Sequence, residues 1–284
     1  PLTMGTLLVY GLKTTDASYL YQFFPSKRLN EAAAALGIAD QWSMSIFYPG
    51  SDIDSCVETA AGQRVLMRGE LPMELYQAME ARGIRTVNKA QAVQTARDKL
   101  ATVEFCRKHG LPHPHTVELT PTMEQPPLDY PFVVKPRYGK MGKGVRLIEN
   151  PEQYKQVRSE ENLLAQEYVQ HSYGRDVRFF FAAWPGGTDF LCVSRHSASW
   201  LSNAHQGGHM SVFSPHDELV SMAQTAFTHS GLDYGTVDFL FADKGGSSFT
   251  LCELNACPGF EELERATGCD GARAILTRTL ECRP

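Results

Sequence analysis

The chain has 284 residues, of which 43% are hydrophobic and 21% are charged, the composition of an ordinary soluble globular protein. Its net charge of −5 argues against a nucleic-acid-binding protein with a broad basic face, and no apolar run approaches the roughly 20 residues that a membrane span needs. The seven cysteines are scattered without a Cys-x-x-Cys pair, and the first residues lack the pattern of a secretory signal. We therefore expect a cytoplasmic protein that has neither a nucleic acid nor a membrane as partner.

The first 88 residues alternate between apolar runs and helix-forming stretches. Runs suited to buried parallel strands occupy residues 6–10, 64–67 and 86–88. Helices are expected over residues 31–36 and 72–82, each followed directly by a glycine. This alternation predicts a small parallel sheet covered by helices, and no Gly-x-Gly-x-x-Gly accompanies it.

The remaining residues change character after a proline-rich stretch. Residues 89–109 are predicted to form one helix of mixed charge, and the six prolines between residues 112 and 131 predict a loop that leads to a new unit. Strands are expected at residues 132–135, 145–148, 163–169, 177–182, 190–194, 237–241 and 249–254, with helices at 151–158 and 219–229. Antiparallel sheets that carry helices on one side are therefore expected, an α+β arrangement after the initial α/β part.

A glycine-rich turn follows the apolar strand that ends in Lys135. It contains Lys140 and Lys143 together with three glycines, Gly139, Gly142 and Gly144. Glycines let backbone N–H groups approach an anion closely, and lysines add charge where phosphate oxygens would lie. The turn is not a Walker A loop, because Gly-Lys-Ser/Thr is missing. Phosphate binding and a flexible hairpin with solvated lysines are both consistent with this pattern alone.

Residues 237–255 predict a β-hairpin whose turn lies near residues 245–246. Symmetric pairing about that turn places Asp238 opposite Glu253, and Asn255, two residues further on, shares their face. Like charges in opposite positions repel, so a hard cation such as Mg²⁺ would explain the pair. A solvated face, or a register shifted by one residue, is the alternative. The other face, expected to be core, carries Phe239, Phe241 and Cys252.

In order and spacing, these motifs resemble the ATP-grasp ligases, and more closely their RimK-like branch, the ribosomal-protein glutamate ligases and their relatives. The resemblance covers roughly residues 86–280, and the first 85 residues fit the family only as a small α/β domain. The matching segments are Asn88-Lys89-Ala90-Gln91, Ala96-Arg97-Asp98-Lys99, Lys135 with its glycine loop, Gln166-Glu167-Tyr168-Val169, Gly174-Arg175-Asp176-Val177-Arg178, residues 202–208, Glu253-Leu254-Asn255-Ala256-Cys257-Pro258-Gly259 and Glu264-Arg265-Ala266-Thr267-Gly268.

The resemblance implies an ATP-grasp fold, of mixed α/β and α+β class, in three parts. A small N-terminal Rossmann-like (pre-ATP-grasp) domain would span residues 1–88. A central ATP-grasp subdomain over residues 89–169 would carry the glycine-rich loop and the lid, at roughly residues 110–168. A C-terminal ATP-grasp subdomain over residues 170–284 would carry the Mg²⁺-binding strands. Assembly as a homo-oligomer is implied as well.

The resemblance also implies site residues. ATP phosphates would be bound by Lys99, Lys135, Gly139, Lys140, Gly142 and Gly144. Adenine and ribose would be bound by Gln166, Glu167, Tyr168, Val169 and Asp176, with the backbone of Glu167 and Val169 contacting the base. Two Mg²⁺ ions, for which Mn²⁺ can substitute, would be held by Asp238, Glu253 and Asn255. Arg195 and Asn203 would act near the transferred phosphoryl group and the acyl phosphate.

The implied reaction joins a carboxylate to an amine through an acyl phosphate, with release of ADP. An amino acid such as glutamate would be added to a small molecule, a peptide or a protein. Trp200-Leu201 stands where the protein-glutamylating members have Phe-Arg, a pattern nearer to relatives that act on small molecules or carrier proteins. Two alternatives stay open: a ligase that modifies a ribosomal peptide, and an ATP-binding regulatory protein without turnover.

Overall fold

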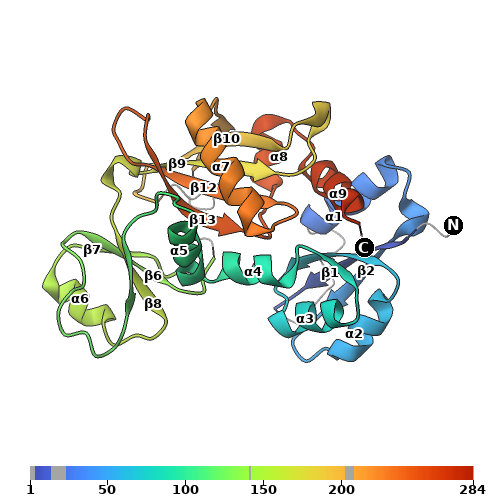
Figure 1. Cartoon of the computed structure of the whole chain (residues 1–284), viewed down its shortest axis with the longest axis horizontal. Coiled ribbons are helices and arrows are strands. Elements are labelled where there is room, and N and C mark those ends of the chain that lie inside the picture. Colours follow the sequence, from blue (N-terminus) through green and yellow to red (C-terminus); the bar gives the residue numbers. More distant parts are fainter. Residues whose placement is uncertain (1–3, 14–23, 141, 202–207, 284) are drawn as a thin grey trace.

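The computed structural model describes residues 4–13, 24–140, 142–201 and 208–283. Three sheets organise the chain: an N-terminal sheet in blue and cyan, a central sheet in green, and a C-terminal sheet in yellow to red (Figure 1). None of the helices within the described ranges has the length and apolar character needed to cross a bilayer. The α/β and α+β succession predicted from the sequence is confirmed.

The N-terminal sheet is parallel, with the strand order β2-β1-β3-β4. Its strands are β1 (Thr6–Gly11), β2 (Trp42–Phe47), β3 (Arg64–Gly69) and β4 (Arg85–Val87), and its helices are α1 (Phe24–Ala35), α2 (Ile53–Ala60) and α3 (Met73–Ala81). The sequence did not predict β2 because this edge strand is only half-buried and alternates apolar residues with serines, so it lacks an apolar run.

Two helices lead out of the N-terminal sheet where one was expected. The predicted helix over residues 89–109 is wrong in one respect: α4 (Ala90–Arg97) and α5 (Lys99–Lys108) are separated at Asp98. Asp98 has an extended backbone, and its carboxylate accepts hydrogen bonds from the N–H groups of Leu100 and Ala101. An aspartate that caps a helix in this way starts a new helix axis, although the run of helix-forming residues continues across it.

The central and C-terminal sheets are antiparallel. The central sheet has the order β5-β8-β6-β7, and the C-terminal sheet has the order β11-β10-β9-β12-β13. The central elements are β5 (Thr116–Leu119), β6 (Phe132–Pro136), β7 (Arg146–Ile148), α6 (Pro151–Val157) and β8 (Leu163–Glu167). The C-terminal elements are β9 (Arg175–Phe181), β10 (Phe190–His196), β11 (His209–Val212), α7 (Asp217–Ser230), β12 (Gly235–Phe241), β13 (Phe249–Asn255), α8 (Glu261–Thr267) and α9 (Gly271–Glu281). Short 3₁₀ turns cover Ala39–Gln41, Gln170–Ser172 and Pro185–Gly187.

Buried side chains connect two of the sheets and leave the third apart. Apolar residues of the N-terminal and C-terminal sheets share two continuous core clusters, which include Val65 with Phe239 and Leu66 with Phe180. The central sheet has its own small core, built around Phe132. A unit with a separate core can move as a body, which is the property that the lid prediction requires. The predicted boundaries at residues 88 and 169 remain predictions.

Candidate functional site

Charged side chains form a stripe across one face of the C-terminal sheet. Arg195 on β10 lies opposite Asp176 on β9, Asp238 on β12 lies opposite Arg178 on β9, and Asp238 is also opposite Glu253 on β13. Opposite residues of antiparallel strands point to the same side, so the five side chains face one region. We call these five residues the charged stripe.

Within the charged stripe, the two arginines bind the two aspartates through paired hydrogen bonds. Arg178 donates to both carboxylate oxygens of Asp238 at 2.9 and 2.6 Å, and Arg195 donates to both oxygens of Asp176 at 2.7 and 2.6 Å. Arg195 Nη2 is also 3.0 Å from Asp238 Oδ2. Burial by itself raises the pKa of Asp238, but the two guanidinium groups outweigh burial and hold this pKa below its usual range. Asp238 is therefore a buried, ionised carboxylate.

The hairpin prediction is confirmed where it concerns the polar face. Asp238 pairs with Glu253, and Asn255 is two residues further along the same strand. The carboxylate of Glu253 makes no hydrogen bond or ion pair with the residues that the structure describes, although its charge acts on Lys99 and Arg195. Asn255 Oδ1 accepts a hydrogen bond from the Cys257 N–H at 2.9 Å. Glu253 is thus the carboxylate of the charged stripe that remains open to a cation.

Cys252 does not lie on the core face, and this part of the hairpin prediction is wrong. The register shifts between Asp238 and Phe239, so that Phe239 pairs with Leu251 and leaves Cys252 as the extra residue of a β-bulge. The thiol consequently lies close enough to Lys135 and Glu253 for electrostatic interaction. Burial raises the pKa of Cys252 to about 11, so the thiol is protonated at neutral pH. Phe239 and Phe241 are in the core as predicted.

Two lysines face the charged stripe from other elements. Lys135 on β6 is buried and donates to Gln166 Oε1 at 3.0 Å, and Gln166 in turn donates to Thr116. Lys99 is the first residue of α5. Burial lowers the pKa of Lys99, Glu253 opposes this effect, and Lys135 adds to it. Lys99 is thus close enough to both Lys135 and Glu253 for electrostatic interaction, although different elements hold the two lysines.

The glycine-rich loop bridges the lysines and the N-terminal sheet. Lys99 Nζ donates to the carbonyl oxygen of Gly139 at 2.6 Å, and Lys140 Nζ is 3.0 Å from Glu70 Oε1, just after β3. Gly144 has a φ of +74°, and a Cβ there would lie 2.8 Å from Pro136, so glycine is required at this position. Gly142 also has a positive φ. Lys140, predicted to contact phosphate, is in this conformation paired with a carboxylate.

The predicted adenine-binding residues lie at the end of β8, where the chain passes from the central to the C-terminal sheet. Glu167 donates its N–H to the carbonyl of His115, and the carbonyl of Val169 accepts from Ser172. The ring of Tyr168 meets the ring of Trp200 edge-on at 6.2 Å between centroids. Asn203 lies outside the described residues. The predicted base-binding segment thus leads, through the turn Gln170–Ser172, into the strand that carries Asp176.

Oxygen atoms of the charged stripe, together with that of Asn255 on β13, fit a hard divalent cation. Asp238, Glu253 and Asn255 offer two carboxylates and one amide oxygen, and the Asn255 oxygen has a second lone pair beyond the one that Cys257 uses. Within the described ranges no group of three or more His, Cys, Asp or Glu side chains is arranged to hold a metal by itself. This is the chemistry of Mg²⁺, which keeps few protein ligands and completes its shell with phosphates and water.

Sequence reasoning missed two residues of this region. Arg178 binds Asp238, and Glu70 binds Lys140. The sequence contained a signal for Arg178, because this residue is two positions from Asp176 on a predicted strand and must share its face. The sequence contained no signal for Glu70, because nothing local indicates that the end of β3 approaches a loop 70 residues away.

Asp98 is expected to stabilise the protein in two separable ways. It caps α5, and it binds Arg137 Nε and Nη2 at 2.8 and 2.7 Å. We expect Asp98→Ala to lower the free energy of unfolding by about 2 kcal/mol, and Asp98→Asn, which keeps a good cap, by about 1 kcal/mol. Urea unfolding at pH 7 measures both effects.

The charge effect of Asp98 has a defined pH dependence. Burial raises the pKa of Asp98, but Arg137 and the capped N–H groups lower it more, so the folded pKa is below the ordinary value of 3.8. The stabilisation is therefore complete above about pH 4 and is lost as the pH falls through the folded pKa. The difference between the wild type and Asp98→Asn should shrink in acid. A difference that stays constant would contradict the ion-pair explanation.

A family model and a curated relative both match the larger part of this chain. The family model described as "RimK-like ATP-grasp domain" matches residues 96–279. A "Probable alpha-L-glutamate ligase" of Parasynechococcus marenigrum is 32% identical over 209 residues, which are 69% of this chain and 44% of that protein. The match thus covers less than half the length of that relative.

Solved structures share the fold at low sequence identity. D-alanine–D-alanine ligase from Bacillus anthracis has a TM-score of 0.69 at 17% identity, covering 98% of this chain and 97% of its own. The ATP-grasp ligase PsnB, complexed with a phosphomimetic variant of a minimal precursor, Mg and ADP, has a TM-score of 0.66 at 16% identity and covers 99% of both chains.

Proposed function

The chain belongs to the RimK-like ATP-grasp family, and from this premise we propose that it is an ATP- and Mg²⁺-dependent ligase that joins a carboxylate to an amine with release of ADP. The reaction would pass through an acyl phosphate. An amino acid is the proposed donor class, and glutamate is the first candidate because the relative described above is named a probable glutamate ligase.

One observation carries this proposal. Two cationic side chains, Lys99 and Lys135, and a carboxylate pair, Asp238 and Glu253, approach one region from separate sheets and helices. Phosphoryl transfer needs neutralised phosphate charge and aligned reactants, and it needs no protein nucleophile. Lysines for the phosphates, next to carboxylates that can share a cation with those phosphates, are the arrangement that this chemistry requires.

Each residue of the chain then has a physical role. Lys99 and Lys135 would bind phosphate oxygens, and the loop around Gly139 would close over them and keep water from the acyl phosphate. When bound by Asp238, Glu253 and Asn255, Mg²⁺ supplies charge neutralisation on the phosphates. Arg195 would stabilise the negative charge that develops on the acyl oxygen as the amine attacks. Asp176, to which the resemblance assigns the ribose, binds the guanidinium of Arg195 with both carboxylate oxygens and would hold it in place for that role.

A second candidate function is the modification of a peptide. The fold is shared over nearly the whole chain with an ATP-grasp ligase whose structure contains a phosphomimetic variant of a minimal precursor. In that case the amine or the acid would belong to a peptide side chain, and the phosphate-binding residues would act as before.

Hydroxylamine provides a test that does not require the amine to be known. It attacks an acyl phosphate and gives a hydroxamate, so the protein incubated with ATP, Mg²⁺, hydroxylamine and single carboxylic acids should form ADP and one hydroxamate, identified by mass. We expect glutamate to react among the amino acids. The Glu253→Gln variant is the control, and it should form both products far more slowly than the wild type.

The outcomes separate the alternatives. A hydroxamate from another acid would retain the ligase and exclude glutamate, and a hydroxamate only from a peptide would favour peptide modification. Binding of ATP with Mg²⁺ but no product from any acid would favour a regulatory protein without turnover. Absence of ATP binding would overturn the proposal as a whole.

A further inference from the structure

The open end of the β12–β13 hairpin rests on the N-terminal sheet. β12 begins at Gly235 and β13 ends at Asn255, and the two ends are so close that a Cβ on Gly235 would lie 2.5 Å from the carbonyl oxygen of Asn255. Two N-terminal residues reach this end, Arg68 from β3 and Asn88 from the position directly after β4. The end of the strand that carries Asn255 is therefore in contact with a sheet distant in the sequence.

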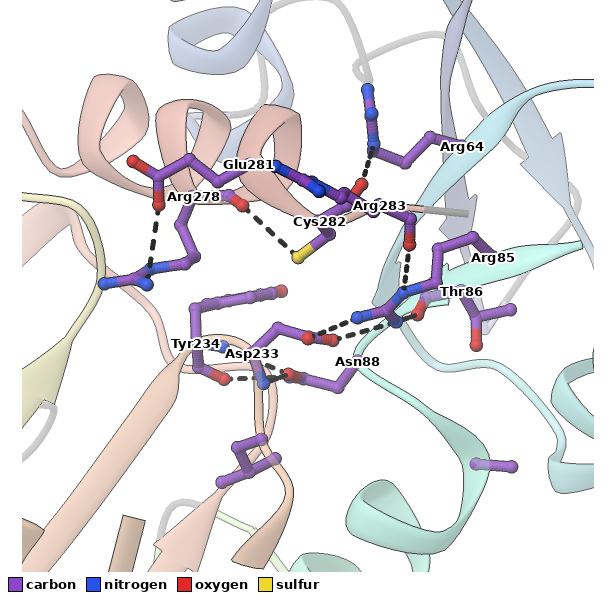
Figure 2. Close-up of polar contacts among 12 residues, drawn as sticks. Arg64, Arg85, Thr86, Asn88, Asp233, Tyr234, Arg278, Glu281, Cys282 and Arg283 are labelled. Carbon is purple, nitrogen blue, oxygen red and sulfur yellow. Dashed lines mark hydrogen bonds and ion pairs between the residues drawn. The ribbon is translucent and has the colours of Figure 1, made fainter. Parts of the chain in front are cut away.

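Asn88 is buried and uses its whole amide on this hairpin end. Its Oδ1 accepts from the N–H groups of Asp233 and Tyr234 at 2.6 and 3.1 Å. Its Nδ2 donates to the carbonyl oxygens of Tyr234 at 2.9 Å and Ala256 at 2.8 Å. Figure 2 shows the Asn88 side chain pointing at the Asp233–Tyr234 backbone. One side chain thus joins the segment before β12 to the residue that follows Asn255.

The amide of asparagine is well suited to this position. A primary amide offers two donor hydrogens and an oxygen with two lone pairs, and all four are satisfied here. Aspartate has the same shape but cannot donate, so it would set a carboxylate against the carbonyl oxygens of Tyr234 and Ala256. The contact is thus sensitive to an almost isosteric change.

Arg68 holds the next part of the segment after β13, residues 256–259, which we call the β13 turn. It is 2% exposed, and its Nη2 donates to the carbonyl oxygen of Pro258 at 2.8 Å while Nη1 donates to the Tyr234 hydroxyl at 3.1 Å. Its guanidinium carbon is 5.9 Å from the ring centre of Tyr234 and 5.3 Å from that of Phe260. Rings and oxygens therefore surround a cation that forms no ion pair with the described carboxylates.

We propose that Asn88 and Arg68 are positioning residues for the Mg²⁺ ligands on β13. The inference rests on the proposed function, in which Asn255 and Glu253 hold the metal. Asn88 fixes the carbonyl of Ala256, next to Asn255, and Arg68 fixes Pro258, next to Cys257. The Cys257 N–H donates to the Asn255 amide oxygen and belongs to the same peptide group as the Ala256 carbonyl. Asn88 therefore holds the peptide group that orients Asn255, and Arg68 holds the Pro258 carbonyl that follows.

Substitution of Asn88 or Arg68 should weaken Mg²⁺ binding and leave the binding of the nucleotide without Mg²⁺ unchanged. Asn88→Asp and Arg68→Lys should raise the Mg²⁺ concentration at half-saturation roughly ten- to hundred-fold, the range for residues that orient metal ligands from outside the coordination shell. The affinity for ADP without Mg²⁺ should remain that of the wild type, since neither side chain contacts the segment proposed to bind adenine. Calorimetric titration of the protein with ADP, at a series of Mg²⁺ concentrations, measures both quantities.

Arg64→Met is the matched control. Arg64 also joins the N-terminal sheet to the C-terminal part of the chain, but it donates to the carbonyl of Cys282 at 2.7 Å (Figure 2). That carbonyl follows α9 and is not part of the β13 turn. Its loss should leave the Mg²⁺ dependence unchanged even if it lowers the melting temperature. An equal shift in Arg64→Met would show general loosening and overturn the inference.

Two further outcomes are decisive. Folded Asn88→Asp and Arg68→Lys proteins, verified by circular dichroism, with the wild-type Mg²⁺ dependence would overturn the positioning role. If one variant does not fold, the other carries the same test. A wild-type protein that binds ADP equally with and without Mg²⁺ would instead refute the metal site of the proposed function, so the two failures are distinguishable.

Discussion

The Glu253→Gln protein is expected to fold like the wild type and to lose Mg²⁺-dependent ADP formation by a factor on the order of 10²–10³. The carboxylate of Glu253 forms no hydrogen bond or ion pair with the residues that the structure describes, so glutamine should change the free energy of unfolding by less than about 1 kcal/mol. The same substitution removes the charge that a cation would bind.

The physical reason lies in the distribution of charge along the charged stripe. Asp238 is already neutralised by Arg178 and Arg195, whereas Glu253 faces Lys99 at a longer, electrostatic range. The carboxylate that has no guanidinium partner, Glu253, should therefore contribute most of the binding free energy of a divalent cation at this site. Glutamine keeps the shape and an oxygen donor but not the charge, and an amide oxygen is a weaker ligand for Mg²⁺.

Initial rates of ADP formation in the hydroxylamine reaction, measured over a series of Mg²⁺ concentrations, check this expectation. Glu261→Gln is a suitable control, because Glu261 is an exposed carboxylate on α8 that pairs only with its helix neighbour Arg265 among the described residues. An unchanged rate and Mg²⁺ dependence in Glu253→Gln would exclude Glu253 as a metal ligand.

The parts that could be predicted from the sequence depend on local pattern. The partnership of Asp238 and Glu253 follows from strand alternation and a tight turn, both of which are encoded within residues 237–255. The parallel and antiparallel strands with apolar runs were predicted for the same reason. The half-buried edge strand β2 was not, since its residues do not need to be apolar on both faces.

The parts that could not be predicted depend on single residues or on distant contacts. The bulge at Cys252 adds one residue to a strand whose composition stays strand-like on both sides, so the pattern carries no trace of it. The break at Asp98 is similarly hidden in a continuous helical sequence. Arg178 and Asp238 are 60 positions apart, and Arg68 and Pro258 are 190 apart. Only the three-dimensional arrangement brings these pairs together.

Asp238→Asn, in contrast to Glu253→Gln, is expected to destabilise the fold by about 3–5 kcal/mol. Asp238 is the shared partner of Arg178 and Arg195, and all three side chains are nearly buried. An asparagine cannot balance two guanidinium charges, and uncompensated buried charge is costly. Urea unfolding of both single variants at neutral pH gives the comparison directly.

A double-mutant cycle identifies the source of the Asp238 effect. If the loss comes from unpaired charge, then adding Arg178→Gln to Asp238→Asn should cost less than the sum of the two single changes, by about 1–3 kcal/mol. The paired geometry of Arg178, with both nitrogens on the two oxygens of Asp238, is what makes strong coupling the expectation. Strictly additive losses would instead mean that the two residues stabilise the C-terminal sheet independently. Asp238 could then exchange Arg178 for a metal ion without loss of folding free energy.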